Sequence, residues 1–295
     1  MPALKKKAMN NPFHGLGTAL ITPFTPDGNV DYECLAVLTE RQIAGGVDFL
    51  CVLGTTAETP TLTDEEKRRI MQTVVRVNAG RVPLLLGAGG NCTHQVCQWI
   101  SSADLSGFQG LLIVAPYYNK PSQEGLFQHF KAVSAVSPLP LILYNIPGRT
   151  GVNITPATVL RLIAACPNIV GIKEASGLRD QISQLLREAP ADFGVICGDD
   201  SIALPLMQEG AAGVISVIAN ALPEHFRCVV DDRDAAAEQR LQAIVRLTMA
   251  DGNPSGIKAI LHAMGLCPNV LRLPLVPVCS AVEQEIKTEM KAFQA

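Results

Sequence analysis

One lysine of this chain lies within an otherwise apolar run. The run, residues 168–176 (NIVGIKEAS), is typical of a β-strand, whose side chains alternate between two faces. We expect Val170 and Ile172 on one face and Lys173 on the other. Burial of that second face disfavours the ammonium form of Lys173 and leaves a neutral amine that can attack a carbonyl carbon. The pattern therefore predicts Schiff-base chemistry, the alternative being a lysine that extends to solvent or pairs with Glu174.

Hydroxyl groups and a guanidinium follow other apolar runs. Tyr144 lies within the run LILYNIP, and Thr55 comes directly after FLCVLG. Hydroxyl groups can pass protons between a carbinolamine and solvent without carrying a fixed charge. Arg149 follows a Pro-Gly turn, where its guanidinium could bind a substrate carboxylate through two parallel hydrogen bonds. Alone, these residues could be a core aromatic, a turn residue and a solvated arginine, but beside Lys173 they indicate one site.

The elements that must position these residues are eight short apolar runs, each followed by a stretch with helical periodicity. Because the runs do not alternate with polar residues, both faces of each strand should be covered, as in a parallel sheet. The runs recur about every 28 residues, which suits a strand, a helix and two short loops. We predict an α/β fold, a TIM (β/α)8 barrel whose site lies at the C-terminal ends of the strands. The runs begin at Gly17, Phe49, Pro83, Gly110, Leu141, Asn168, Phe193 and Gly213.

The βα rhythm stops after about Asp234, and three helical patterns follow. We expect residues 1–234 to form the barrel that carries the active site, and residues 235–295 to form a C-terminal three-helix appendage. No Gly/Ser-rich linker separates the two parts, so the helices should pack on the barrel. Thr63 with Glu66 three residues later predicts a capped helix start within the barrel.

The composition excludes several classes of protein. Among 295 residues, 48% are hydrophobic and 17% charged, which excludes a disordered or collagen-like chain. The net charge of −3 provides no basic field, so we expect small-molecule partners, no nucleic acid and no membrane. The basic run at Lys5 is not followed by an apolar stretch, so no secretory signal is expected. The nine cysteines are an odd number and include no C-x-x-C pair, so we expect neither disulfides nor a structural zinc site. This cysteine usage favours a reducing cytoplasm.

Two further patterns could suggest bound groups. Asp199 and Asp200 have no matching His or Glu pair at a neighbouring strand end, so capping of the next helix is favoured over metal binding. The stretch GAGGN at residues 87–91 matches neither common phosphate-binding motif and is typical of a tight turn. We therefore expect no metal.

Four segments resemble the motifs of the dihydrodipicolinate synthase family, which belongs to the N-acetylneuraminate lyase superfamily of pyruvate-dependent class I aldolases. The resemblance continues through GDD at Gly198, GVISV at Gly213 and LRLP at Leu271, and so covers nearly the whole chain. The four segments are GTTAET from Gly54, PYYNKPSQEGL from Pro116, YNIPGRTG from Tyr144 and GIKEASG from Gly171.

The resemblance implies condensation of pyruvate with L-aspartate 4-semialdehyde, in the diaminopimelate route to lysine, on a TIM barrel with a helical C-terminal part. Lys173 would form the covalent Schiff base with pyruvate, and no cofactor would be needed. Tyr144 would relay protons through Thr55 to Tyr118, a tyrosine that in this family enters the neighbouring subunit's site. The resemblance thus implies a homo-oligomer, at least a dimer, with tetramers common.

The remaining implied roles concern substrate binding. Thr56 would hold the pyruvate carboxylate and Arg149 the semialdehyde carboxylate. The backbone at Gly198 and Ile215 would line the pocket.

The chain departs from the family pattern in two places. Ala57 stands where the family has glycine, so the loop must avoid a positive φ there or tolerate the methyl group. Asn91 and Tyr117 match the inter-subunit site at which lysine inhibits some members, but Gln95 replaces an acidic residue and Lys67 a His or Glu. A bound lysine would lose one charge-assisted hydrogen bond and meet a like charge, so we expect weak or absent inhibition.

Two other functions fit parts of this pattern. Another pyruvate-dependent lyase, an N-acetylneuraminate lyase or a 2-keto-3-deoxy sugar acid aldolase, would share the chemistry at Lys173. A non-catalytic small-molecule sensor on a degenerate barrel would have lost pocket residues, whereas Lys173, Tyr144 and Thr55 are all present. Covalent trapping of pyruvate by borohydride would separate the sensor from the enzymes.

Overall fold

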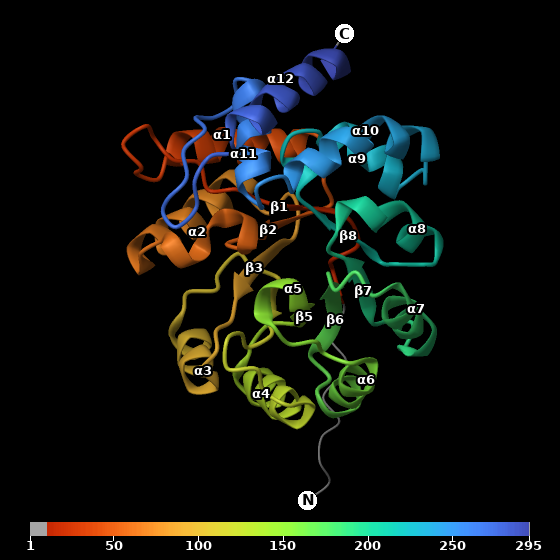
Figure 1. The fold of residues 1–295 in the computed structure, drawn as a ribbon. Coiled ribbons are helices and arrows are strands. Elements are labelled where there is room, and N and C mark those ends of the chain that lie inside the picture. Colours follow the sequence, from red (N-terminus) through yellow and green to blue (C-terminus); the bar gives the residue numbers. More distant parts are fainter. Residues whose placement is uncertain (1–10, 295) are drawn as a thin grey trace, which may run out of the picture.

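Eight parallel strands close into one barrel in the order of the sequence, β1 to β8 (Figure 1). The computed structural model describes residues 11–294. Each of the eight apolar runs overlaps one strand, although β1 begins two residues before its predicted run, and the closed barrel confirms the predicted TIM fold. The strands are β1 (Gly15–Ala19), β2 (Phe49–Val52), β3 (Leu84–Ala88), β4 (Gly110–Val114), β5 (Leu141–Asn145), β6 (Ile169–Glu174), β7 (Gly194–Cys197) and β8 (Gly213–Ser216).

Helices follow the strands and surround the barrel (Figure 1). The predicted capping box forms at the start of α2, where Thr63 Oγ1 accepts a hydrogen bond from the Glu66 backbone N–H at 3.2 Å. None of the helices in residues 11–294 is long and apolar enough to span a membrane. The barrel's helices are α1 (Tyr32–Ala44), α2 (Asp64–Asn78), α3 (Thr93–Ser102), α4 (Gln123–Val136), α5 (Pro147–Thr150), α6 (Pro156–Ala165), α7 (Arg179–Glu188), α8 (Ala203–Gln208) and α9 (Pro223–Val230).

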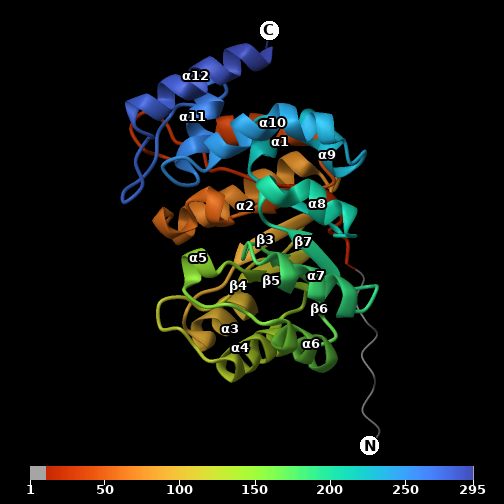
Figure 2. The same cartoon turned by 45° about the vertical axis from the view of Figure 1, so that its right-hand side comes forward.

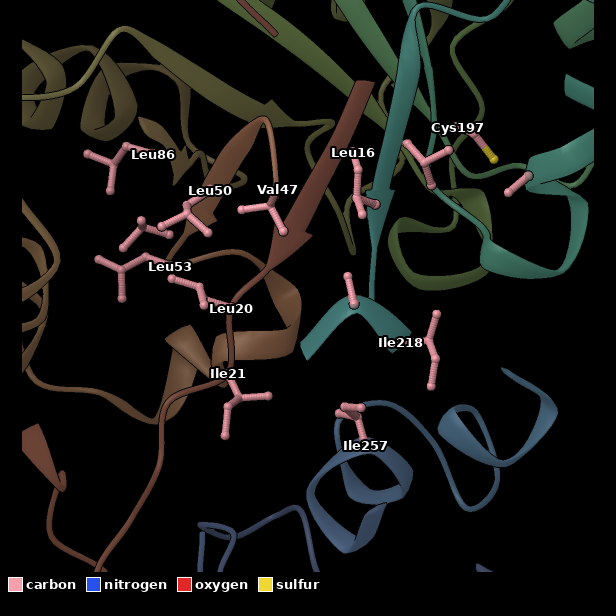
Figure 3. Packing of buried hydrophobic residues seen from close by; sticks show 14 of the residues in the cluster. Leu16, Leu20, Ile21, Val47, Leu50, Leu53, Leu86, Cys197, Ile218 and Ile257 are labelled. Atoms are coloured by element: carbon pink, nitrogen blue, oxygen red, sulfur yellow. The ribbon is translucent and has the colours of Figure 1, made fainter. Parts of the chain in front are cut away.

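Two hydrophobic clusters divide the strand side chains. The larger one joins alternate strand residues to the helices, and Figure 3 shows part of it. The smaller one is built from strand residues and Phe13, so it fills the barrel interior. Val170 belongs to this inner cluster and Ile172 to the outer one, so the expectation that they share a face is wrong. A register shift between β5 and β6 inserts Val170 beside the inward-facing residues and breaks the alternation.

Three helices follow the barrel, as the sequence predicts: α10 (Ala235–Thr248), α11 (Ser255–Ala263) and α12 (Ser280–Gln294). Helix α10 packs on α9 and on the 3-10 turns η3 (Asp200–Ile202) and η4 (Ile218–Asn220), which follow β7 and β8 (Figure 2). Helix α11 also packs on η4, and α12 packs on α10 and α11. In Figure 3, Ile257 of α11 lies close to Ile21 and Ile218, and all three belong to the outer cluster. The C-terminal helices therefore cover the end of the barrel where the strands finish. The domain boundary at residue 234 stays a prediction.

Candidate active site

Lys173 points into the barrel, as the sequence predicts. It lies on β6, where its register partners are Tyr144 of β5 and Ile196 of β7, both in the inner cluster. The Nζ atom is 4.5 Å from the centroid of the Tyr144 ring. Lys173 is only 6% exposed, so its amine is held in a largely dry environment beside one phenol ring.

The neighbouring carboxylate does not neutralise this amine. Glu174 is buried and accepts hydrogen bonds from Asn145 Nδ2 at 3.1 Å, from Gln181 Nε2 at 3.0 Å and from the Ser176 backbone N–H at 2.9 Å. Burial raises the pKa of Glu174, although these donors oppose the shift. Within the described part of the chain Glu174 makes no ion pair with Lys173, so the alternative of a Lys173–Glu174 pair is wrong.

A cavity of about 320 Å³ brings several predicted residues together at the mouth of the barrel. Thr55, Tyr144 and Arg149 line it, together with Tyr117. These side chains come from the loops after β2, β4 and β5 and from β5 itself. Hydroxyl groups and one cation thus face a common space beside the inward-facing Lys173.

The loop after β2 carries the two threonines in a single 3-10 turn, η1 (Thr55–Ala57). Thr55 is half-buried, and Thr56 is 3% exposed. Ala57 is buried and has no positive φ, whereas Glu58 takes a left-handed conformation with φ of 54°. The chain therefore accommodates the alanine because position 57 does not take a left-handed conformation.

A strand-end glycine makes room for the lysine. A Cβ atom on Gly198 would lie 2.9 Å from Lys173 Cε, closer than such contacts occur. Ile215 of β8 is buried in the inner cluster. Gly198 directly follows β7 and Ile215 lies within β8. Neither is among the residues that line the 320 Å³ cavity, but Gly198 lies against Lys173 itself.

The acidic pair after β7 is used for capping. Asp199 Oδ1 accepts from the Ser201 backbone N–H at 3.0 Å, and Asp200 Oδ2 accepts from the backbone N–H groups of Val217 and Ile218 at 2.8 Å each. Burial raises the pKa of Asp200 to about 6, and the two N–H donors oppose this shift. Within residues 11–294, no three His, Cys, Asp or Glu side chains come together as a metal site.

Asn253, from the C-terminal segment, joins two of the predicted binding residues. Its Nδ2 donates to Thr56 Oγ1 at 3.0 Å, and its backbone carbonyl accepts from Arg149 Nη2 at 3.1 Å. The residue is 8% exposed, and its Oδ1 has no hydrogen-bond partner among the described atoms. Because Thr56 Oγ1 accepts from Asn253, its own O–H is left to donate to another group.

Tyr118 differs from the other predicted residues. It is 87% exposed, with a positive φ of 75°. Like Lys173, Thr56, Gly198 and Ile215, it is not among the residues that line the cavity, but those four residues are buried or lie against the lysine. The Tyr118 ring therefore extends away from the site of its own chain. This placement is compatible with a role in a neighbouring subunit, and it leaves the proton relay without its last member inside one chain.

The match to a family model decides the family. The Dihydrodipicolinate synthetase family model matches residues 12–293. The chain belongs to this family.

Its relatives in the family cover almost its full length. It is 50% identical over 270 residues to the 4-hydroxy-tetrahydrodipicolinate synthase of Phocaeicola vulgatus, a match that spans 89% of this chain and 91% of the relative. The structure of dihydrodipicolinate synthase from Thermotoga maritima superposes with a TM-score of 0.93 at 37% identity, covering 96% of this chain and 99% of the other. The chloride-inhibited dihydrodipicolinate synthase from Acinetobacter baumannii, solved in complex with pyruvate, gives a TM-score of 0.91 at 36% identity, covering 96% and 99% of the two chains.

Asn253 was not predicted as a site residue from the sequence. The dipeptide Asn253–Pro254 indicates only a turn, and no apolar run leads into it. Its contact with Thr56 joins positions 197 residues apart, so no local pattern could have revealed it.

Proposed function

We propose that this chain condenses pyruvate with L-aspartate 4-semialdehyde to form 4-hydroxy-tetrahydrodipicolinate. The observation that carries this proposal is the buried Lys173 amine, held 4.5 Å from the Tyr144 ring beside a cavity lined by hydroxyl groups and Arg149. An inward-facing amine of this kind is suited to attack a ketone carbonyl. The 50% identity to a 4-hydroxy-tetrahydrodipicolinate synthase supports the choice of reaction.

The first half of the reaction links pyruvate to the enzyme. The Lys173 amine adds to the keto carbon, and the nitrogen gives up a proton as the keto oxygen is protonated to form a carbinolamine. The carbinolamine hydroxyl then takes up a second proton and leaves as water, which gives an iminium between Nζ and the keto carbon. In this proposal the Tyr144 hydroxyl moves these protons, because its ring is the aromatic group packed against Nζ, and Thr55 continues the path to solvent.

The second half joins the two substrates. Loss of a methyl proton converts the iminium to an enamine, whose carbon attacks the aldehyde carbon, and the aldehyde oxygen takes up a proton to become a hydroxyl. The amine of the second substrate then adds to the iminium carbon, closes the ring and releases Lys173 as a free amine. One water molecule is released overall, and Lys173 itself provides the electron sink, so the proposal needs no cofactor.

Two side chains are assigned to the carboxylates. The Thr56 hydroxyl, which accepts from Asn253 and keeps its own proton available, would donate to the pyruvate carboxylate. Arg149 uses one N–H on the Asn253 carbonyl and has further donors, which face the cavity that it lines. It would bind the semialdehyde carboxylate.

The assembly is part of the same proposal. Tyr118 is 87% exposed on the loop after β4 and would complete the proton path in a second copy of this chain. A dimer, or a tetramer of paired dimers, would place it there. All nine cysteines lie within the described residues and none forms a disulfide, which supports a reducing cytoplasm as the working compartment.

The deciding experiment is turnover of pyruvate with L-aspartate 4-semialdehyde, coupled to the following reductase and monitored by NADPH consumption. We expect turnover by the wild-type enzyme and its loss in Lys173→Ala. Borohydride treatment with pyruvate should label Lys173 and leave the variant unlabelled. Labelling without turnover would refute the second substrate and favour a sugar-acid aldolase, whereas absence of labelling would favour a sensor.

A further inference from the structure

The loop that carries Thr55 and Thr56 is attached to the C-terminal part of the chain. Within the loop, Thr59 Oγ1 donates to the carbonyl oxygens of Leu53 and Gly54, each at 2.9 Å. One contact comes from the loop after β1, where Thr22 Oγ1 donates to the Ala57 carbonyl at 2.8 Å. The other long-range side-chain contacts described for this loop involve residues 253–272, so the C-terminal segment sets its position.

The strongest of these contacts is a buried ion pair. Glu58, two residues after Thr56, pairs through Oε1 with Nζ of Lys258 on α11, and neither side chain is exposed to solvent. Lys258 Nζ also donates to the Val270 carbonyl at 2.9 Å and lies 4.1 Å above the centroid of the Phe24 ring. Burial lowers the pKa of Lys258, and the Glu58 carboxylate opposes that shift.

The second oxygen of Glu58 is bound by the backbone of the same C-terminal segment. Glu58 Oε2 accepts from the Arg272 backbone N–H at 3.1 Å. The Arg272 side chain then donates to the Thr61 carbonyl at 3.0 Å and to Glu66 Oε2 at 2.8 Å. Both ends of the loop that follows Thr56 are therefore fixed to residues 258–272.

We propose that Glu58 and Lys258 are positioning residues, which hold Thr55 and Thr56 in place for reaction at Lys173. The inference rests on the proposed function. Neither residue touches the cavity, so both act through the loop. A buried ion pair contributes little to stability compared with apolar side chains of similar volume, because two charges must be desolvated. What the pair adds is a directional link between α11 and the residue that ends η1.

The test compares three variants. Lys258→Met removes the buried cation and keeps the volume of the side chain. Glu58→Gln with Lys258→Met removes both charges, so that no unpaired charge remains buried and the chain can fold. Lys287→Met is the matched control, because Lys287 pairs with Glu283 on the surface of α12, far from the loop in sequence. Thermal unfolding, kcat/KM for pyruvate and the pyruvate dependence of borohydride labelling are measured for each.

We expect kcat/KM for pyruvate to fall by about tenfold or more in Lys258→Met, with half-maximal labelling shifted to higher pyruvate, because a misplaced threonine binds the carboxylate less well. The double variant should recover the wild-type melting temperature, whereas its kcat/KM for pyruvate should stay low. Lys287→Met should match the wild type. A purely structural pair would lower the melting temperature and leave kcat/KM unchanged, or recover kcat/KM in the double variant, and either result would overturn the inference.

The two proposals fail in different ways. If the wild-type enzyme does not turn over L-aspartate 4-semialdehyde, the proposed function fails. Borohydride labelling requires only pyruvate and Lys173, so it still reports whether Lys258→Met displaces the loop. An unchanged labelling curve for both Lys258 variants would refute the positioning role on its own.

Discussion

The amide of Asn253 determines which way the Thr56 hydroxyl donates. Its Nδ2 lies 3.0 Å from Thr56 Oγ1, and the threonine proton is therefore free for the pyruvate carboxylate. Replacing Asn253 by alanine removes this hydrogen bond and leaves the backbone contact to Arg149 in place. One net hydrogen bond corresponds to about 0.5–1.5 kcal/mol, so kcat/KM for pyruvate should fall by roughly two- to twelvefold.

Replacing Asn253 by aspartate should have a larger effect of a different kind. The aspartate oxygen would accept the Thr56 proton and turn the hydroxyl away from the substrate. It would also place a negative charge near the substrate. Because the 3.0 Å contact and a second hydrogen bond of about 2.8 Å meet at an angle at Thr56 Oγ1, the nearest oxygens of the two carboxylates would lie about 5 Å apart. At an effective dielectric constant of about 20 the repulsion is about 3 kcal/mol, or on the order of a hundredfold in pyruvate binding.

The assay is the same coupled turnover, with pyruvate varied at saturating semialdehyde, for the wild type and both Asn253 variants. Thermal unfolding shows whether each variant remains folded. We expect the order wild type, Asn253→Ala, Asn253→Asp, with the aspartate variant partly recovering at lower pH as its carboxylate is protonated. Equal effects of the two substitutions would refute the assigned direction of the hydrogen bond, and no effect of either would refute the role of Thr56.

Two further predictions concern stability and inhibition. Because burial raises the pKa of Asp200 to about 6 from 3.8, the protonated carboxyl favours the folded state, and its contribution should be lost as pH rises through about 6. Asp200→Asn should therefore be more stable than the wild type above pH 6, by up to about 3 kcal/mol in denaturant titrations. The same difference in unfolding free energy between variant and wild type at pH 4 and at pH 8 would contradict this. Millimolar lysine should inhibit turnover weakly or not at all, because Lys67 meets the ligand with a like charge. The ion pair of Lys67 with Asp64, at 3.3 Å, offsets that charge only in part. Complete inhibition would contradict this prediction.

Much of the fold could be predicted because each strand is marked locally. Eight apolar runs identify eight strands, and their spacing leaves room for one helix between neighbours. The same local pattern placed Lys173 inside the barrel. It failed at Val170, because the alternation assumes an unbroken register and the shift between β5 and β6 depends on how two strands pair.

The candidate site likewise contains residues that local patterns predict and residues that they do not. Lys173 and Tyr144 lie near the ends of their apolar strands, and Thr55 follows another strand, so the barrel geometry alone brings them to one end. Tyr118 also lies at a strand end, yet it is exposed, and the role proposed for it requires a second chain, which intrachain patterns do not describe.

No local sequence pattern identifies the residues proposed to position the site. Lys258 belongs to a stretch, SGIKAILHAMG, that is typical of an amphipathic helix, in which a lysine is normally solvated. It is buried because it meets Glu58, 200 residues earlier in the chain. A lysine that keeps its charge in the interior needs a partner that compensates this charge, and for Lys258 the tertiary fold supplies Glu58. The reacting groups could thus be predicted from their strands, whereas the groups that orient them became visible only when α11 was placed against the loop after β2.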